Sequence, residues 1–358
     1  MQVTIFKNIT TEKNPSMHIY AQELLKNMPS NVKDFSIRAN KLPIFKYYLE
    51  KEFIYPLVAA RHQADVNHIS DQSYCGLLKA IDPDKTVVTC HDLTPLLYPK
   101  TVSAAGRIRY WHNVKLLPRA KRIITVSDFS RKSIMRFFGN SIAQRIKVIP
   151  NGVSDIFKPA AISKEALKNK YRIKDKAILH VGKAYKHKNI DILLEFLRMH
   201  PEIQLVKVGP LLNSHARYIK QHRLDKQIMH FPFMDLYREN NLTEIYNCVD
   251  AIVMPSLFEG FGLPILEALA CGCPVICSDI PPFHEVAAGA AIFFDPLDLK
   301  SLEKCINDLF NGQTLRVDLI KKGFEIAKDY NWKKCACETY KIYEEIYNEN
   351  KKAGITSK

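Results

Sequence analysis

The chain has 358 residues, 47% of them hydrophobic and 25% charged, a composition typical of a globular protein long enough for two domains. No apolar run approaches the roughly 20 residues that a membrane-spanning helix needs, and the start of the chain indicates a strand rather than a signal peptide. The nine cysteines include no Cys-x-x-Cys pair, so we expect reduced thiols and a cytoplasmic protein.

The net charge of +15 is concentrated in the first half of the chain. Residues 1–160 contain 24 Lys and Arg against 12 Asp and Glu, whereas residues 161–358 contain 28 against 25. Within residues 101–150, eleven basic residues accompany a single acid, Asp128, and are interleaved with aromatic and leucine residues. Such a segment favours contact with an anionic acceptor or an anionic membrane surface, which attracts each nearby basic residue by about 1 kcal/mol. A solvated face that keeps the protein soluble is the alternative.

Predicted strands and helices alternate in two series along the chain. In the first half, apolar runs predict strands over Val3–Phe6, Val66–Ile69, Thr86–Cys90, Arg122–Val126 and Ile146–Ile149. Helices are expected over Ile19–Met28 and Ser130–Phe138. In the second half, strands are expected over Ala177–Val181, Gln204–Val208, Ala251–Met254, Val275–Cys277 and Ala291–Phe294. Helices are expected there over Ile190–Met199, Leu242–Cys248, Leu299–Phe310 and Trp332–Tyr347. This alternation predicts an α/β protein with two doubly wound, Rossmann-like domains and parallel sheets.

The region between residues 150 and 160 separates the two series. Prolines and an Asn-Gly pair cluster there, and such clusters are typical of connections between folded elements. We therefore expect an N-terminal domain over residues 1–158 and a second domain over residues 159–332.

The segment between Glu259 and Glu267 carries the strongest chemical signal in the chain. Two glycines follow a predicted buried strand and lead into a short helix over residues 265–270, with Pro264 at its first position. A helix start of this kind presents backbone N–H groups that are not used within the helix, and these groups bind phosphate well. The pattern therefore predicts a phosphate site at this point of the chain.

The two carboxylates suit the remaining parts of a nucleotide sugar. Glu267 is expected in the first turn of the helix, where an ionised carboxylate can accept hydrogen bonds from both hydroxyls of a ribose. Glu259 precedes the glycines and can orient a sugar. Each glutamate alone is equally consistent with a solvated or dipole-complementing side chain. The joint pattern favours a ligand site.

This segment resembles the E-x7-E motif of the family 4 retaining glycosyltransferases, and similarity to that family extends from about Thr86 to Trp332. The resemblance implies the GT-B fold, in which two Rossmann-like domains face each other across a cleft. It implies transfer of a hexose, of the mannose or glucose type, from a nucleotide-diphosphate sugar to an acceptor hydroxyl. It also implies that the final segment, 333–358, packs back on the acceptor-binding N-terminal domain.

The resemblance implies roles for particular residues of the nucleotide-sugar-binding domain. Glu259 would bind hydroxyls of the donor sugar, and Glu267 would bind the ribose. Lys183 and Lys188 follow the strand at 177–181 and would stabilise the charge on the departing diphosphate. The family usually has arginine where Lys183 stands, so the planar, bidentate grip of arginine on phosphate is lost here. The backbone that would bind the nucleotide comprises Phe261, Gly262, Leu263, Pro264 and Ile265.

His91 follows the predicted strand at 86–90, where the family carries a histidine that faces the donor sugar and the acceptor. A neutral imidazole at a strand end can hold a sugar hydroxyl. A bystander histidine beside a turn-capping Asp92 is the alternative. The largest departure from the family lies near the start of the chain, where Asn14-Pro15-Ser16-Met17 replaces a pair of glycines that approaches the donor phosphates. Pro15 also lacks an N–H donor.

Three other polar segments have simpler interpretations. Asp82-Pro83-Asp84 has the D-x-D spacing of a metal-binding signature, but it precedes its strand and suits a turn, so no metal or other cofactor is expected. Ser127 is expected to cap the helix that follows it. Asp71 lies at a strand end and either meets the acceptor or serves the fold.

The expected partners are a nucleotide-sugar donor and a glycan or lipid-linked acceptor, in the synthesis of polysaccharide, glycolipid or another cell-envelope glycan. The protein is expected in the cytoplasm or on the inner face of the membrane. Nucleic acid is not expected, because the chain contains no recognisable nucleic-acid motif. Two alternatives stay open: a GT-B nucleotide-sugar epimerase, which needs no acceptor, and a basic nucleic-acid-binding protein with a vestigial donor site.

Overall fold

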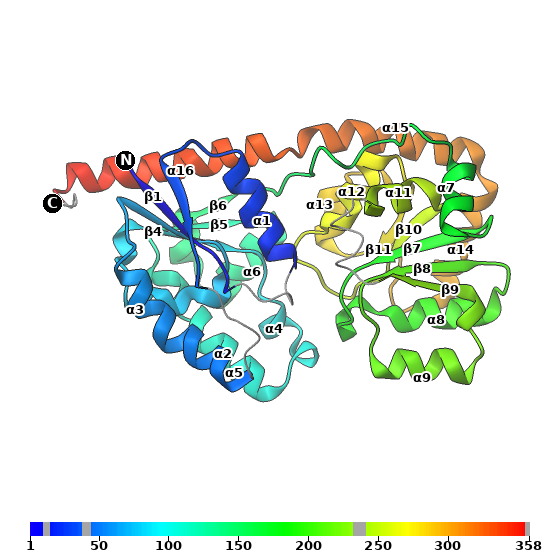
Figure 1. The fold of residues 1–358 in the computed structure, drawn as a ribbon, viewed down its shortest axis with the longest axis horizontal. Coiled ribbons are helices and arrows are strands. Elements are labelled where there is room, and N and C mark those ends of the chain that lie inside the picture. The colour runs from blue at the N-terminus through cyan, green and yellow to red at the C-terminus, as the bar shows by residue number, and fades with distance from the viewer. Residues whose placement is uncertain (10–14, 38–43, 232–240, 355–358) are drawn as a thin grey trace. The chain divides into compact units, whose positions relative to one another are not determined.

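The computed structural model describes residues 1–9, 15–37, 44–231 and 241–354 of the chain. These residues divide into two compact units (Figure 1). Unit 1 comprises Met1–Gly152 and Trp332–Lys358, and unit 2 comprises Val153–Asn331. The division precedes the expected boundary at residues 158 and 159, because Val153 already pairs with Asn331 and donates a hydrogen bond to the carbonyl of Tyr330 at 2.9 Å.

Unit 1 contains a parallel six-stranded sheet in the order β2-β1-β3-β4-β5-β6. Its strands are β1 (Val3–Phe6), β2 (Val32–Phe35), β3 (Val66–Ile69), β4 (Thr86–Cys90), β5 (Arg122–Thr125) and β6 (Ile146–Val148). Its α-helices are α1 (Pro15–Lys26), α2 (Ile44–Leu49), α3 (Tyr55–Ala60), α4 (Thr94–Leu97), α5 (Ala104–Val114), α6 (Asp128–Phe138) and α16 (Trp332–Lys352). A π-helical turn, η1 (Glu50–Ile54), joins α2 to α3, and the 3₁₀ turn η2 (Gln72–Lys79) follows β3.

The last helix of the chain, α16, completes the core of unit 1. Trp332 and Tyr343 are buried in a cluster that includes Val3 of β1, Tyr20 of α1 and Val66 of β3. The aromatic face of α16 is therefore core, and unit 1 is built from two separate stretches of the chain (Figure 1).

A buried hydrogen-bond network joins α16 to the sheet of unit 1. His68 of β3 contacts the Tyr343 hydroxyl through Nδ1 at 2.6 Å and the Thr89 hydroxyl through Nε2 at 2.7 Å. The Tyr20 hydroxyl lies 3.0 Å from the same Thr89 oxygen. Burial, and then the nearby His91, lower the pKa of His68 to about 3, so the imidazole is neutral in the folded protein.

We predict that His68 makes unit 1 sensitive to mild acid. The folded protein does not protonate His68 until about pH 3, whereas the unfolded chain binds this proton near pH 6.5. Stability is therefore lost as the pH falls from about 6.5 towards 3, by about 2 kcal/mol at pH 5 from this group alone. Denaturant unfolding should be measured at pH 7.5 and at pH 5. The decrease in the free energy of unfolding between these pH values should be about 2 kcal/mol smaller in His68→Gln than in the wild type. Equal losses in the two proteins would show that the imidazole is not the titrating group.

Unit 2 contains a second parallel six-stranded sheet, in the order β12-β11-β10-β7-β8-β9. Its strands are β7 (Ala177–Val181), β8 (Gln204–Val208), β9 (Ile228–Phe231), β10 (Ala251–Met254), β11 (Val275–Ser278) and β12 (Ala291–Phe294). Its described α-helices are α7 (Lys164–Tyr171), α8 (Ile190–Met199), α9 (Asn213–Gln221), α11 (Asn241–Cys248), α12 (Leu263–Cys271), α13 (Pro281–Ala287), α14 (Leu299–Asn311) and α15 (Gln313–Asp329). The core on one face of the sheet is formed by α8, α9 and α14.

Each sheet has one point at which the strand order reverses. In unit 1 the first strand, β1, lies between β2 and β3, and in unit 2 the first strand, β7, lies between β8 and β10. The connections that leave the two central strands at such a point diverge to opposite faces and open a crevice at the carboxyl ends, where ligands bind in open α/β sheets. The topology therefore predicts ligand sites at the carboxyl ends of β1 and β3 and of β7 and β10.

Candidate functional site

The strand ends at the reversal point of unit 2 carry three of the predicted site residues. Lys183 and Lys188 lie between β7 and α8, and Glu259 lies between β10 and α12. The two loops are tied together by a hydrogen bond from the Leu257 N–H to the His187 carbonyl at 2.7 Å. The sequence therefore placed these residues at the reversal point of the sheet in unit 2.

Lys188 and Glu259 form an ion pair across the two loops. The Lys188 ammonium donates to Glu259 Oε1, which also accepts a hydrogen bond from the Ser256 hydroxyl at 2.8 Å. Both side chains are largely withdrawn from water, at 16% and 13% exposed. Burial raises the pKa of Glu259, but Lys188, His187 and the two hydrogen bonds together outweigh it, so the pKa lies below its ordinary value. Glu259 is consequently ionised at neutral pH.

Lys183 occupies a different position in the same loop. Its ammonium lies 5.9 Å from the centre of the Tyr185 ring, a cation–π distance. The preceding Gly182 has φ of +153°, and the loop ends at Asn189 with φ of +53°. These two conformations, which few residues adopt readily, turn the chain from β7 into α8 and fix where the lysines lie.

The glycine-rich loop after Glu259 ends in a helix start, as predicted, but the helix begins earlier than expected. Gly262 precedes α12 with φ of +117°, and the helix starts at Leu263 rather than at Pro264. Glu267 is therefore the fifth helical residue, and its predicted place in the first turn was wrong. The Ile265 N–H donates to the Gly262 carbonyl at 2.9 Å. Among the hydrogen bonds of the described residues, none uses the N–H of Gly262 or Leu263, and these two groups are the donors that a phosphate can use.

Glu267 is held in place by a residue that the sequence did not single out. The carboxylate is only 5% exposed and accepts a hydrogen bond from the Tyr246 hydroxyl at 2.7 Å. Tyr246 belongs to α11, is itself buried, and packs against the ring of Phe157. A tyrosine at an apolar helical position is usually core, so only the tertiary contact shows that Tyr246 orients the carboxylate.

His91 lies beyond the end of β4 in unit 1 and is almost completely buried. Its Nε2 is 3.0 Å from the Ser70 carbonyl, and because a carbonyl only accepts, Nε2 carries the proton. In the tautomer with the proton on Nε2, Nδ1 is an acceptor. The backbone N–H of His91 donates to the Gln72 side chain at 3.0 Å, and the Tyr20 ring meets the imidazole edge to face at 4.7 Å. Gln72 and Tyr20 thus orient His91, although sequence reasoning selected neither.

The reversal point of unit 1 carries Asn8 and Asp71. The Asn8 amide donates to Asp71 Oδ2 at 2.7 Å, and Oδ1 of the same carboxylate caps η2 through the Ser73 N–H at 2.7 Å. Asp71 is therefore engaged by the fold. Nearby, Pro15 begins α1, while residues 10–14 lie outside the described part of the chain.

The other polar segments behave as local structure. Ser127 caps α6 through the Ser130 N–H at 3.0 Å, as predicted. Asp82 caps a 3₁₀ turn through the Asp84 N–H at 3.0 Å. Within the described ranges, no group of three or more His, Cys, Asp or Glu side chains is arranged to hold a metal ion.

We predict that the Lys188–Glu259 pair is strongly coupled. Lys188→Met leaves a buried carboxylate without its counter-charge, and breaking a buried pair in this way costs about 3–5 kcal/mol. The double variant Lys188→Met/Glu259→Gln removes both charges and should recover part of that loss in denaturant unfolding. Lys322→Met breaks an exposed pair with Asp318 and serves as the control with a small effect. Additive losses in the double variant would mean that the two charges are not coupled.

Two family models match the chain, one in each unit. A model described as Glycosyltransferase Family 4 matches residues 9–155, and a model described as Glycosyl transferases group 1 matches residues 163–326.

The chain is also similar to curated proteins and to solved structures. O-antigen chain mannosyltransferase B of Escherichia coli is 30% identical over 278 residues, which cover 73% of this chain and 70% of that protein. O-antigen chain mannosyltransferase RfbU of Salmonella typhimurium is 30% identical over 241 residues, covering 64% of this chain and 65% of that protein. Anabaena HepE in complex with UDP and glucose superposes with a TM-score of 0.78 at 18% identity, over 96% of this chain and 99% of that one.

Proposed function

The chain belongs to glycosyltransferase family 4, and we propose that it transfers a hexose from a nucleotide-diphosphate sugar to an acceptor hydroxyl with retention at the anomeric carbon. It is a glycosyltransferase of glycan synthesis with the GT-B fold that its sequence predicted. The two mannosyltransferase relatives favour mannose as the hexose, and the UDP and glucose bound by HepE keep glucose as the second candidate. We assign the donor to unit 2 and the acceptor, a cell-envelope glycan or its lipid-linked form, to unit 1.

The observation that carries this proposal is the ionised Lys188–Glu259 pair beside the start of α12, at the reversal point of a parallel sheet. A nucleotide sugar needs cations for its diphosphate, backbone donors for phosphate oxygens and carboxylates for its hydroxyls. In the proposal, Lys188 and Lys183 bind the diphosphate and Glu259 binds hydroxyls of the hexose. Glu267, held by Tyr246, binds the ribose.

The proposed reaction needs no covalent intermediate with the protein. The bond between the anomeric carbon and the diphosphate oxygen breaks, and the acceptor oxygen bonds to the same face of that carbon. The acceptor proton passes to the departing phosphate oxygen. The protein contributes positioning and charge stabilisation. Lys188 stabilises the negative charge that develops on the diphosphate, and Nδ1 of His91 accepts a hydrogen bond from a sugar hydroxyl.

The donor assignment is tested by thermal unfolding in the presence of UDP, GDP or ADP. We predict that one nucleotide stabilises the protein, by about 2.7 kcal/mol at 100 times its dissociation constant. Glu267→Gln should lose most of this stabilisation, because the amide keeps only one acceptor oxygen and no charge for the two ribose hydroxyls. Glu259→Gln should keep it but should lower turnover with the matching nucleotide sugar sharply, because its partner is the hexose.

Stabilisation by none of the three nucleotides would contradict the donor site. Equal loss of nucleotide binding in both variants would contradict the division of roles between the two glutamates. Release of free nucleotide only when acceptor is present separates a transferase from an epimerase, which converts the nucleotide sugar without an acceptor.

We also propose that unit 1 binds an anionic membrane on its cytoplasmic face and meets the acceptor there. Phe53, Leu57 and Ile108 are 66%, 69% and 68% exposed, and Trp111 is 40% exposed. Ile108 and Trp111 belong to α5, Phe53 to η1 and Leu57 to α3. The Asn113–Glu52 hydrogen bond at 2.8 Å joins α5 to η1. The exposed basic residues of the same region are Arg107, Arg109, Lys115, Arg119, Lys132 and Arg136. We call these residues together the apolar-basic face.

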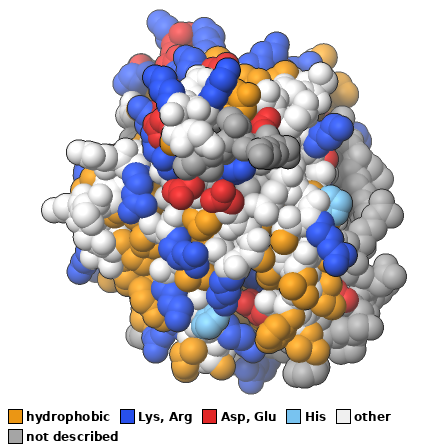
Figure 2. All heavy atoms as spheres, turned by 90° about the vertical axis from the view of Figure 1, so that its left-hand side faces the viewer, with side chains coloured by type: hydrophobic (Ala, Val, Ile, Leu, Met, Phe, Trp, Pro, Cys, Tyr) orange, Lys and Arg blue, Asp and Glu red, His pale blue; other side chains and the backbone are white. Residues whose placement is uncertain are grey.

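Apolar side chains that insert between lipids, with cations at the level of the head groups, form the combination that binds anionic bilayers. Figure 2 shows hydrophobic and basic side chains lying next to one another over the lower part of one face of the molecule. Among the described helices, none has both the length and the apolar character needed to cross a bilayer.

We predict that the protein sediments with vesicles that contain phosphatidylglycerol and that this binding weakens steeply as salt is added. Leu57→Ser/Ile108→Ser should reduce binding several-fold, because it removes two of the most exposed apolar side chains. Leu297→Ser/Val317→Ser changes two apolar residues of unit 2 that are 81% and 57% exposed, and it should bind like the wild type. Salt-insensitive binding, or equal losses in the two double variants, would contradict the assignment.

A further inference from the structure

Lys207 of β8 is a buried lysine at the carboxyl end of the sheet in unit 2. Its side chain is 0% exposed, and its ammonium donates hydrogen bonds to the carbonyls of Gly182 and Val208, both at 2.7 Å. Among the described ion pairs, none joins Lys207 to a carboxylate. Two carbonyls satisfy hydrogen bonds of the ammonium but provide no full counter-charge. A buried cation in this state is costly to maintain.

The residues around Lys207 are mainly basic, and the acid among them, Asp191, pairs with His215 rather than with Lys207. In the sheet register, Lys207 stands between His180 of β7 and His230 of β9. His180 is 0% exposed, and neither of its ring nitrogens has a hydrogen-bond partner. The His230 Nε2 donates to the Gly209 carbonyl at 2.7 Å, and His215, from α9, lies 3.4 Å from Asp191 of α8.

Lys207 also lies next to the loop that carries the predicted diphosphate residues. The carbonyl that it holds belongs to Gly182, directly before Lys183. A Cβ atom placed on Gly182 would lie 3.5 Å from the His180 ring and 4.0 Å from Cε of Lys188. Burial, and then Lys188, lower the pKa of Lys207 to about 7. The pKa of His180 is lowered well below its ordinary value by burial, then by Lys207 and Lys188.

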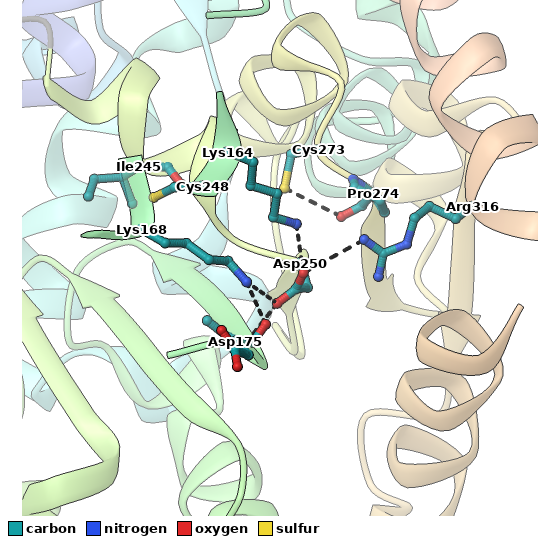
Figure 3. Close-up of polar contacts among 10 residues, drawn as sticks. Lys164, Lys168, Asp175, Ile245, Cys248, Asp250, Cys273, Pro274 and Arg316 are labelled. Atoms are coloured by element: carbon teal, nitrogen blue, oxygen red, sulfur yellow. Dashed lines mark hydrogen bonds and ion pairs between the residues drawn. The ribbon is translucent and has the colours of Figure 1, made fainter. Parts of the chain in front are cut away.

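At the opposite end of the same sheet, a cluster of cations has an internal counter-charge, the Asp250 carboxylate (Figure 3). There, Asp250 at the start of β10 pairs with Lys164 at 2.6 Å, with Lys168 at 3.3 Å and with Arg316 at 3.7 Å. The carboxylate also accepts from the Ala177 N–H at 2.8 Å. The cations at the amino ends of the strands therefore share an internal anion, whereas Lys207 at the carboxyl ends has none.

We propose that Lys207 is a positioning residue for the donor diphosphate, anchoring the Gly182–Lys188 loop through the Gly182 carbonyl and supplying buried positive charge beneath the phosphates. This inference rests on the proposed function. The incoming diphosphate provides the anion that the protein itself does not, so binding stabilises the protonated lysine. Binding therefore draws a proton onto Lys207, and the affinity for the donor falls as the pH rises from 6 towards 9.

The test compares Lys207→Met with the wild type, using whichever of UDP-glucose, GDP-mannose and ADP-glucose raises the melting temperature of the wild type. The diphosphate of a nucleotide sugar is esterified at both ends and does not titrate near neutrality, so the pH dependence reports the protein. We expect about tenfold weaker binding at pH 6.5 in the variant. A tenfold change is the effect on affinity when binding raises the pKa of Lys207 by about one unit. We also expect the decline in wild-type affinity between pH 6 and pH 9 to flatten in the variant.

Lys168→Met is the matched control, because Lys168 is also a largely buried lysine of unit 2 but lies at the opposite strand ends. It should lower the melting temperature while leaving donor affinity and its pH profile unchanged. A second measurement needs no variant: calorimetric titration of the wild type at pH 7.5, in two buffers of different ionisation enthalpy, should show proton uptake on binding.

The outcomes distinguish failure of the proposed function from failure of the role of Lys207. If none of the three nucleotide sugars stabilises the wild type, the proposed function fails. If the wild type binds one of them but takes up no proton, the role of Lys207 fails while the donor site stands. The same holds if a folded Lys207→Met variant keeps the affinity and pH profile of the wild type.

Discussion

The ion pair between Lys188 and Glu259 is the interaction on which the organisation of unit 2 depends. It joins the loops that follow β7 and β10, the two strands between which the sheet order reverses. Without this pair, each loop would carry a charge withdrawn from water with no partner, a condition that proteins rarely tolerate. The pair therefore fixes the two loops relative to each other, and in the proposed function it supplies charges for a diphosphate and a sugar.

Unit 1 builds its strand-end cluster from a different kind of contact. His68, Thr89 and Tyr20 are neutral groups, and hydroxyls, carbonyls and ring edges link them to one another and to His91. Neutral donors and acceptors suit hydroxyl groups, whereas the charged loops of unit 2 suit phosphates. The difference follows the proposed division between an acceptor and a nucleotide-bearing donor, and it arises from side chains mounted on two sheets of similar topology.

The sequence predicts every described interior strand and the edge strands β6 and β12. The two missed strands, β2 and β9, are edge strands, and each includes polar residues such as Asp34 and His230 because one side of an edge strand is not covered by a neighbour. The positions of Lys183, Lys188 and Glu259 could be predicted because each lies a few residues after an apolar run that is recognisable as a strand. The helix start at Leu263 could not, since the left-handed conformation of Gly262 moves it. Tyr246, Gln72 and Lys207 act through tertiary contacts that no local pattern carries.

The contribution of α16 to the core of unit 1 has a consequence for biosynthesis. A ribosome makes β1, β3 and α1 long before it makes Trp332 and Tyr343, which pack against them. During translation, apolar side chains such as Val3 and Val66 therefore lack their native packing partners until α16 has been made. Val153–Asn331, in contrast, is one continuous segment and has all of its own core residues once Asn331 is made. The usual order in which the N-terminal domain is completed first is thus reversed in this chain.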